Sequence, residues 1–450
     1  MKMEIKGKKK LVCGVILFIL LILLPLMYVG VDDFFLGNKI SLDLWMQKKT
    51  MKEKEFIKFH LARLVQGEDR RKLDDTGFAC HRSYQSNHCV STKPVRIDTR
   101  NMTVYVPSDD LRHNETTVWP YPWNGYYVGG VSTVRIVQYT STTPPPPCNF
   151  HHHVPVVVFS SGHIGNTYHE MSEIIIPLFL TVRQFQSRVM FVVEDYIPSF
   201  ISKYNTILTH LSAHEPMNPA TVPAIHCFPA SIVGLKYHGI LALNSSNIPG
   251  GYGMPEFRHF IFDTFGLKTT KVSEITRPRL LLLSRKFTRR ILNEDETIAM
   301  IKDVGFQVIV VNRFDNHDLK KLSHVINTCN VLLGVHGAGL TYDMFLPAGA
   351  VVVQVEPLDL EHYAKVIFAD NARSMGMEYL HYKIEEEESS LVKVFGRNSS
   401  VITDTASVSK HNGIMNSRNV FYEQQNVKLN LVRFRETIVK AFSIVTVPRL

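Results

Sequence analysis

The sequence is poor in cysteine, with six residues in 450. So few cysteines in a chain of this length cannot form a disulfide scaffold, and the fold must rest on hydrophobic cores. No long stripe of lysine and arginine is interleaved with aromatic residues, which argues against nucleic acid as a partner. Neither the G-x-x-x-x-G-K-[ST] loop of many ATPases nor the G-x-S-x-G turn of many esterases occurs. What remains is an ordinary globular composition, with 45% hydrophobic and 20% charged residues.

One uncharged segment stands out near the N-terminus. Residues 11–30 are about long enough to cross a ~30 Å hydrocarbon core as a helix. Residues 1–10 before them contain five lysines and one glutamate. Because positive charge stays in the cytosol, this pattern predicts a type II anchor with a cytosolic tail and a lumenal body. A cleaved signal peptide is the alternative, but no small-residue cleavage site follows. Residues 31–75, of mixed charge, are expected to form a stem.

Cysteine spacing and glycosylation sequons agree with a lumenal body. Cys80 and Cys89 are close enough in sequence for one local disulfide in an oxidising compartment. Pairing among Cys148, Cys227 and Cys329 stays open. Four Asn-x-Ser/Thr sequons follow the predicted anchor, as expected of a lumenal glycoprotein. They are Asn101, Asn114, Asn244 and Asn398.

Apolar, β-branched runs alternate with amphipathic stretches along the body of the chain. The alternation occurs over residues 150–235 and again over 279–357, which favours parallel sheets with helices on both faces. A segment rich in proline and glycine, residues 244–257, separates the two, so we expect an α/β fold with domains 76–265 and 266–450, the second ending in a C-terminal helix. The expected strands are 131–138, 154–161, 188–195, 224–228, 279–285, 306–311, 330–335 and 350–356, and the expected helices are 168–185, 293–305 and 315–329.

Two segments of biased composition are expected at the surface. Three adjacent histidines occur in the predicted loop 140–153. They cannot all face one ion, so a solvated loop is favoured over a metal site. The acidic run at residues 385–390 is expected to form a solvated turn.

The turn "GVHGAG" is a candidate binding element. Gly334 lies near the end of the predicted strand 330–335, and Gly337 and Gly339 follow that strand. Glycines let the backbone bend tightly and approach a ligand, and the start of the following helix presents free N–H groups to an anion. Glu356 ends the next strand, where an acidic side chain can accept hydrogen bonds from ribose hydroxyls. A tight turn without a ligand is the alternative.

A basic segment leaves the carboxyl end of another strand of the same predicted sheet. Open α/β sheets bind ligands at that end. The segment supplies Arg285, Lys286, Arg289 and Arg290, and guanidinium groups suit phosphate oxygens. With the glycine turn it predicts a pocket for a nucleoside diphosphate. No D-x-D sequence occurs, so we expect no bridging divalent metal; arginines and helix-terminal amides would stabilise the leaving group instead.

The sequence resembles glycosyltransferase family 61, in particular the plant branch that adds arabinose or xylose to xylan. The resemblance runs from about Cys80 to the C-terminus, and its motifs include "GNTYHE", "EDY", "GLKYHG", "PGGYGM", "RPRLLLLSR", "LNEDE", "GVHGAGLT" and "QNVKLNLVRF". It implies a GT-B architecture, in which two Rossmann-like domains face a cleft and the second holds the nucleotide. It also implies an inverting Golgi enzyme with a UDP-arabinofuranose or UDP-xylose donor, and xylan or another glycan as acceptor. Positions that coincide with the family pattern are Arg285, Asn293, Glu294, His336, Gly337, Gly339 and Leu340.

Two positions depart from that pattern. Tyr342 stands where an asparagine or histidine is expected, and Glu356 stands where the plant branch often has an apolar residue, which counts against its ribose role. Other family members are alternatives, such as a core β-1,2-xylosyltransferase of N-glycans. A non-catalytic glycan-binding protein of the same fold is another.

Inversion by single displacement needs a base that takes the proton of the acceptor hydroxyl. That base should lie on the first domain, across the cleft. His169 lies near a predicted helix start, and Asp195 ends the predicted strand 188–195. Both are candidate bases, and a capping or core role is the alternative for each.

Overall fold

The computed structural model describes residues 53–83, 86–109, 114–122, 129–142, 144–162, 164–243, 248, 251–312, 318–408 and 417–446. The predicted cytosolic tail and anchor, and the first part of the predicted stem, lie outside these ranges. Within them, no helix has both the length and the apolar character needed to cross a bilayer. The described residues from His60 onward belong to one compact unit.

Two helices occupy the described part of the segment expected to be a stem. They are α2 (Glu53–Ala62) and α3 (Gly67–Thr76). Leu61, Leu64 and Leu73 are buried. This part of the segment is therefore folded, and it contributes apolar side chains to the protein interior.

Two sheets share one core in the first half of the chain. The first is mixed, with β8 paired in parallel to β9 and β11, and the second is mostly antiparallel. Apolar residues of both sheets, among them Val104, Ile136, Val158 and Val233, form a single buried cluster. The first sheet contains β1 (Phe78–Arg82), β2 (Asn87–Ser91), β11 (Ser231–Val233), β8 (Val156–Ser160) and β9 (Met190–Glu194). The second contains β5 (Glu115–Val118), β6 (Val134–Tyr139), β4 (Thr103–Pro107), β3 (Val95–Asp98), β10 (Ile225–Phe228) and β7 (Phe150–His151).

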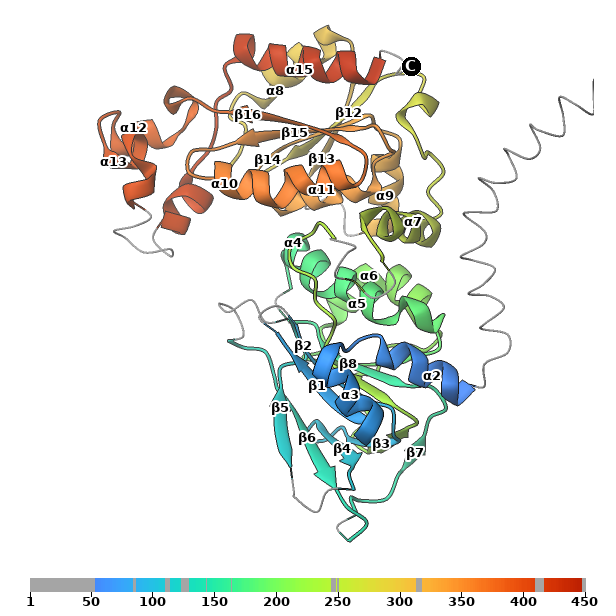
Figure 1. The fold of residues 1–450 in the computed structure, drawn as a ribbon. Coiled ribbons are helices and arrows are strands. Elements are labelled where there is room, and N and C mark those ends of the chain that lie inside the picture. The colour runs from blue at the N-terminus through green and yellow to red at the C-terminus, as the bar shows by residue number, and fades with distance from the viewer. Residues whose placement is uncertain are drawn as a thin grey trace, which may run out of the picture. The chain divides into compact units, whose positions relative to one another are not determined.

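Helices pack on the side of the first sheet that faces away from the second sheet (Figure 1). A nearly continuous helical segment connects β8 to β9, and its apolar side chains from Ile174 to Val182 are buried. It consists of α4 (Thr167–His169), the π-helix η1 (Glu170–Ile175), α5 (Ile176–Val182) and η2 (Arg183–Phe185). The helix α6 (Pro198–Leu211) follows β9, and α7 (Met254–Phe265) follows the glycine-rich junction.

The second half contains a third, wholly parallel sheet with strand order β13-β12-β14-β15-β16. The helices α8 and α15 cover one face, and α9, α10 and α11 cover the other (Figure 1). The strands are β12 (Arg279–Ser284), β13 (Gln307–Asn312), β14 (Val331–Val335), β15 (Val351–Glu356) and β16 (Glu378–Lys383). The helices are α8 (Glu294–Val304), α9 (Leu319–Asn327), α10 (Glu361–Ala364), α11 (Asp370–Ser374), α12 (Leu391–Phe395), α13 (Ser400–Thr403) and α15 (Leu431–Thr446).

The mixed α/β class predicted from the sequence is confirmed. Each of the eight expected strands overlaps an observed strand, because long apolar runs of β-branched residues suit a sheet buried on both faces. The expected helices at 168–185 and 293–305 are also present, while the third starts later, with Asp318 as its N-cap. The strands β1 to β5, β7, β11 and β16 were not predicted.

Two expectations about surface segments are wrong in part. Phe150 and His151 form β7, and the ring of His152 stacks on Phe228 at 4.4 Å, so the histidine triplet is not simply a solvated loop. Glu388, in the expected acidic turn, is buried. Its carboxylate accepts hydrogen bonds from Tyr382 and from the backbone of Asn430, each at 2.6 Å. Asn430 is 42 residues from Glu388 in sequence, so composition alone could not reveal this contact.

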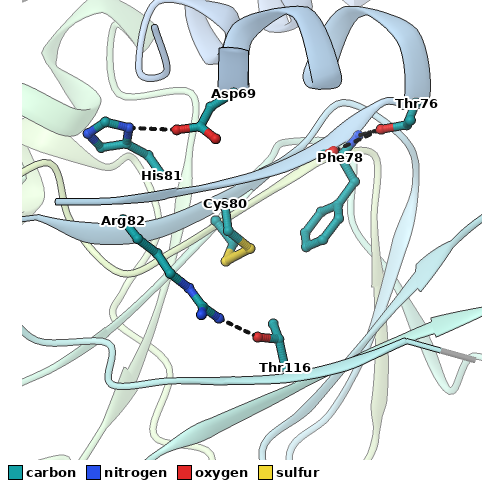
Figure 2. Close-up of a disulfide and its surroundings, with 8 residues drawn as sticks. Asp69, Thr76, Phe78, Cys80, His81, Arg82 and Thr116 are labelled. Atoms are coloured by element: carbon teal, nitrogen blue, oxygen red, sulfur yellow. Dashed lines mark hydrogen bonds and ion pairs between the residues drawn. A yellow bond between two sulfur atoms is a disulfide. The ribbon is translucent and has the colours of Figure 1, made fainter. Parts of the chain in front are cut away.

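Two disulfides are present among the residues that the structure describes. Cys80 and Cys89 face each other in register on the neighbouring strands β1 and β2, as Figure 2 shows, with Arg82 bonded to Thr116 of β5 nearby. The second joins Cys148, just before β7, to Cys227 of β10. The sequon residues Asn101, Asn114 and Asn398 are exposed. Asn244 lies outside the described residues.

Candidate active site

The order of strands in the third sheet reverses between β12 and β14. From this point the chain winds outward in one direction to β13 and in the other to β15 and β16. Ligands of open α/β sheets bind at the carboxyl ends of the strands beside such a reversal. Arg285 directly follows β12, and His336 and Gly337 directly follow β14. The topology therefore brings the basic segment and the glycine turn to the position where the fold can bind a ligand.

The backbone of Gly337 lies against two guanidinium groups. An ideal Cβ atom built on Gly337 would be 2.7 Å from Nη1 of Arg285 and 3.3 Å from Nη1 of Arg289. The backbone angles, φ 156° and ψ 170°, belong to a region that is essentially reserved for glycine. A side chain at this position would displace the Arg285 guanidinium, so glycine is needed for the close approach.

Local hydrogen bonds hold both arginines. Nε of Arg285 donates to the carbonyl oxygen of Thr288 at 2.7 Å, and Nη1 of Arg289 donates to that of His336 at 2.9 Å. Burial lowers the pKa of Arg289. Its buried Nε has no hydrogen-bond partner within the described residues. A buried cationic group in this state favours an anionic partner, and a diphosphate would supply one.

His336 is buried beside these arginines. The side-chain amide of Gln354 donates from Nε2 to Nδ1 of the ring at 2.8 Å. Burial, followed by the charges of Arg289 and Arg285, lowers the pKa of His336 to about 3. The ring therefore stays neutral at physiological pH, and because Nδ1 accepts, its remaining proton is on Nε2. It adds a neutral donor to the site and no further positive charge.

A segment near the C-terminus, residues 425–429, pairs with the basic segment. The backbone N–H of Arg289 donates to Gln425, and that of Leu292 donates to Val427, both at 2.7 Å. The Arg289 guanidinium also lies 5.1 Å from the centre of the Tyr422 ring. Sequence reasoning did not select these residues, because they contact the basic segment through backbone groups and an aromatic ring. Most of them lie in the motif "QNVKLNLVRF".

Several predicted donor-binding residues have side chains that are engaged elsewhere. Asn293 exchanges two hydrogen bonds, each of 2.9 Å, with the backbone of Leu429. Glu294 accepts from the Ser284 hydroxyl at 2.9 Å. These contacts fix the two ends of the basic segment. Arg290 has an exposed side chain, Leu340 lies in the core, Gly334 is inside β14, and Gly339 lies in the 3₁₀ segment η5 (Ala338–Phe345).

Glu356 ends β15 as predicted, but its carboxylate already has neighbours. Oε1 accepts a hydrogen bond from Tyr379 at 3.1 Å, and Oε2 lies 3.3 Å from Nδ1 of His381. Both partners lie on the neighbouring strand β16. A ligand hydroxyl at Glu356 would have to share these oxygens with Tyr379 and His381.

The carboxylate of Asp195 is occupied by hydroxyl and backbone groups. It accepts from the backbone N–H of Ser132 at 3.0 Å, and from the hydroxyls of Ser132 and Ser160 at 2.6 Å each. Its backbone has a left-handed φ of 52°. Asp195 thus fastens the loop after β9 to two neighbouring segments. Next to it, burial and the charge of Asp195 raise the pKa of Glu194 to about 7, a residue that sequence reasoning did not select.

His169 lies on α4, which contacts η5, the segment after Gly337. The hydroxyl groups of Thr167 in α4 and Tyr342 in η5 are 3.3 Å apart, and the two elements make further contacts. Nδ1 of His169 lies 2.7 Å from Oε1 of Glu173. Of the two candidate bases, His169 is the one whose helix contacts the segment that follows Gly337. The same hydrogen bond gives Tyr342, the departure from the family pattern, a link between the two halves of the chain.

Comparisons with known proteins identify the family. The family model described as Glycosyltransferase 61 matches residues 167–353, which include both α4 and the glycine turn. A beta-1,2-xylosyltransferase of Oryza sativa subsp. japonica is 31% identical over 391 residues, which cover 83% of this chain and 68% of that protein. The chain belongs to glycosyltransferase family 61.

Other members of family 61 are similar over most of the chain. An alpha-1,3-arabinosyltransferase of the same rice is 32% identical over 80% of this chain, which spans 63% of that protein. A xylan glycosyltransferase of Arabidopsis thaliana is 27% identical, and the match covers 82% of this chain and 80% of that protein. The chain thus spans less than two thirds of the rice arabinosyltransferase.

The described part of this family 61 chain holds one cluster of possible metal ligands. Cys148, His151 and Cys227 have ligand atoms within 4.8 Å of one another. The two sulfur atoms are joined in a disulfide. This cluster lies in the second sheet of the first half, on other elements than the arginines and the glycine turn.

Proposed function

We propose that this family 61 member is a pentosyltransferase that moves arabinose or xylose from UDP-arabinofuranose or UDP-xylose to xylan, with inversion at the sugar carbon. The printed names of its relatives, an arabinosyltransferase, a xylosyltransferase and a xylan glycosyltransferase, support a pentose and a xylan acceptor. The observation that carries the proposal is the approach of Arg285 and Arg289 to the backbone of Gly337.

The chemistry assigned to this site is stabilisation of a leaving UDP. As the acceptor oxygen bonds to the sugar carbon, the bond from that carbon to the diphosphate oxygen breaks, and negative charge grows on the diphosphate. Two guanidinium groups, the N–H groups of the glycine turn and the neutral His336 ring are donors suited to that charge. The proton of the acceptor hydroxyl passes to a base on the first half of the chain.

No metal is assigned to the reaction in this proposal. The absence of D-x-D in the sequence supports this, and the guanidinium groups supply positive charge where a cation otherwise would. The expected result is full activity after treatment with a chelator. Activity that is lost with the chelator and restored by magnesium or manganese would overturn this part of the proposal.

The proposal includes a GT-B arrangement and a Golgi setting. The parallel sheet wound in both directions from β12 and β14 supports a nucleotide-binding half. The charge pattern of residues 1–30, the two disulfides and the exposed sequon residues support a type II protein held in the Golgi membrane by its own anchor.

The deciding experiment incubates the full chain with a panel of UDP-sugars and two acceptors, xylo-oligosaccharides and an N-glycan glycopeptide. We expect UDP release and a pentosylated product only with a UDP-pentose and xylo-oligosaccharide, and the product linkage should show inversion. Transfer to the glycopeptide alone would identify an N-glycan core xylosyltransferase. Binding of xylo-oligosaccharide without UDP release from any donor would identify a non-catalytic glycan-binding protein.

A further inference from the structure

Glu173 is a buried carboxylate one helical turn beyond His169. Its side chain is 5% exposed, against 30% for His169. Nδ1 of His169 lies 2.7 Å from one of its oxygens, and the Tyr121 hydroxyl donates to the other. Glu173 lies in η1, the π-helical turn that interrupts the helical segment between α4 and α5. Such turns occur frequently at functional sites.

Tyr168 and Tyr237 lie close enough to Glu173 for its charge to affect them. Burial, and next the charge of Glu173, raise the pKa of Tyr168 and of Tyr237, so both remain neutral phenols. The nearby ammonium group of Lys203 pairs instead with Glu170 at 2.5 Å. The 2.7 Å contact places the carboxylate of Glu173 beside the imidazole of His169, where its negative charge stabilises the protonated ring.

The second ring nitrogen of His169 is available. An ionised carboxylate can only accept, so the hydrogen between His169 and Glu173 is on Nδ1, and Nε2 of the neutral ring carries a lone pair. The ring is partly exposed, and no hydrogen bond to Nε2 is found within the described residues. This nitrogen therefore belongs to an element of the first half that contacts η5, the segment directly after Gly337.

A base held by a buried acid is the arrangement that activates hydroxyl nucleophiles in unrelated enzymes. We propose that His169 is the base of the transfer reaction and that Glu173, fixed by Tyr121, is its positioning residue. This inference rests on the proposed function. Nε2 takes the proton of the acceptor hydroxyl while the oxygen bonds to the sugar carbon, and the electron pair of the broken bond leaves with UDP. Glu173 holds the tautomer and stabilises the imidazolium that forms. Asp195 has no such part, because Ser132 and Ser160 already donate to its carboxylate.

Kinetics of single and double variants of the full chain test the inference. We expect His169→Gln to lower kcat by about 10²–10⁴-fold with an unchanged affinity for UDP. Glu173→Gln should lower kcat at least tenfold with little change in the donor KM, and Glu173→Asp should recover part of the loss. In the His169→Gln background, Glu173→Gln should have no further effect, because residues that act as a unit are not additive. A further loss in the double variant would mean that Glu173 acts independently of His169 and would overturn the inference.

The chain offers a matched control pair. His259 and Asp263 of α7 have the same i, i+4 spacing and lie 3.2 Å apart, but both are exposed. Asp263→Asn should leave kcat unchanged. If it reduced kcat as much as Glu173→Gln, loss of any such helical pair would explain the effect and the inference would fail.

A spectroscopic measurement identifies the tautomer of His169 and does not depend on catalytic activity. Nitrogen-15 NMR of labelled histidine, with the His169 signal identified by its absence in His169→Gln, should show a protonated Nδ1 and a bare Nε2. A ring protonated on Nε2 would overturn the inference, even if Glu173→Gln fails to fold. Wild-type protein that transfers no pentose would refute the proposed function. Pentose transfer that is insensitive to both His169→Gln and Glu173→Gln would refute this inference alone.

Discussion

At the scale of single residues, the contact between two guanidinium groups and one glycine makes a direct prediction. Arg285→Ala should weaken UDP binding by about 10- to 100-fold, because a hydrogen bond to a charged group contributes about 1.5–3 kcal/mol. Gly337→Val should abolish binding, since its Cβ would lie 2.7 Å from Nη1 of Arg285. Isothermal titration calorimetry with UDP measures both.

Two exposed positions serve as controls for these variants. Arg435 on α15 pairs with Asp303 at the surface, and a Cβ on Gly129 would have no atom within 4 Å. Arg435→Ala and Gly129→Ala should bind UDP like the wild type. Unchanged UDP affinity in both Arg285→Ala and Gly337→Val would contradict the assignment of the diphosphate to this turn.

The raised pKa of Asp343 predicts that the stability of the protein depends on pH. This fully buried carboxyl, which accepts from the Asn371 amide at 3.0 and 3.1 Å, has its pKa raised by burial from 3.8 to about 7. Between those values the folded state keeps a proton that the unfolded state has released, so the protein loses stability as pH rises. Asp343→Asn removes this loss. Its free energy of unfolding relative to wild type should increase between pH 4 and pH 7 by about 3 kcal/mol, because the slope is 1.36 kcal/mol for each pH unit between the two pKa values and smaller near each of them.

Urea unfolding of Asp343→Asn and wild type at a series of pH values checks this sign. A difference between the two proteins that stays constant across the range would show that Asp343 ionises at an ordinary pKa. A difference that moves in favour of wild type as pH rises would mean that the ionised form is stabilised by its surroundings.

At the scale of elements, the two disulfides should differ in their contribution to stability. Cys80 and Cys89 are separated by 9 residues, and Cys148 and Cys227 by 79. By loop-closure entropy, the longer loop gives about 4.5 kcal/mol and the shorter about 2.7 kcal/mol. Replacing Cys148 and Cys227 by serine should therefore lower the free energy of unfolding more than replacing Cys80 and Cys89. Denaturation under non-reducing conditions measures both, and the reverse order would show that native contacts outweigh chain entropy.

Elements with a strong local pattern could be predicted from the sequence. Runs such as Val156–Ser160 and Val351–Glu356 are buried on both faces, so consecutive residues, and not only alternate ones, are mostly apolar. In contrast, Glu115–Val118 lies at the edge of the second sheet with polar threonines and one glutamate, and only its pairing with β6 makes it a strand. The composition of residues 115–118 does not indicate that such a partner strand exists.

In the candidate site, too, some contacts could be predicted from the sequence and others could not. The meeting of Arg285 with Gly337 could be inferred, because the carboxyl ends of parallel strands must share one edge of the sheet. The neighbours of Asn293, Asp195 and Glu356 could not be inferred. Each is bonded to residues from another element, and sequence spacing does not specify which side chains will meet there.

At the scale of the whole molecule, the C-terminal segment supports the basic segment. Residues 425–429 supply backbone partners to Arg289, Leu292 and Asn293, and Asn430 donates to the buried Glu388. Removing residues 425–450 should abolish UDP binding and lower the melting temperature, because buried polar groups lose their partners. Removing only residues 447–450 leaves these bonds in place and should change neither. UDP binding that survives the longer truncation would show that the basic segment holds its shape alone.

The bond between Asn293 and Leu429 spans 136 residues of chain. A polypeptide still being synthesised can thus form the strands of the third sheet well before the strand-like partner of its basic segment has left the ribosome. A premature stop codon anywhere between these two residues would yield an inactive protein, because the partner of Asn293 would not be synthesised. No partly active fragment is expected. The basic segment is therefore completed by residues translated after the whole of the third sheet.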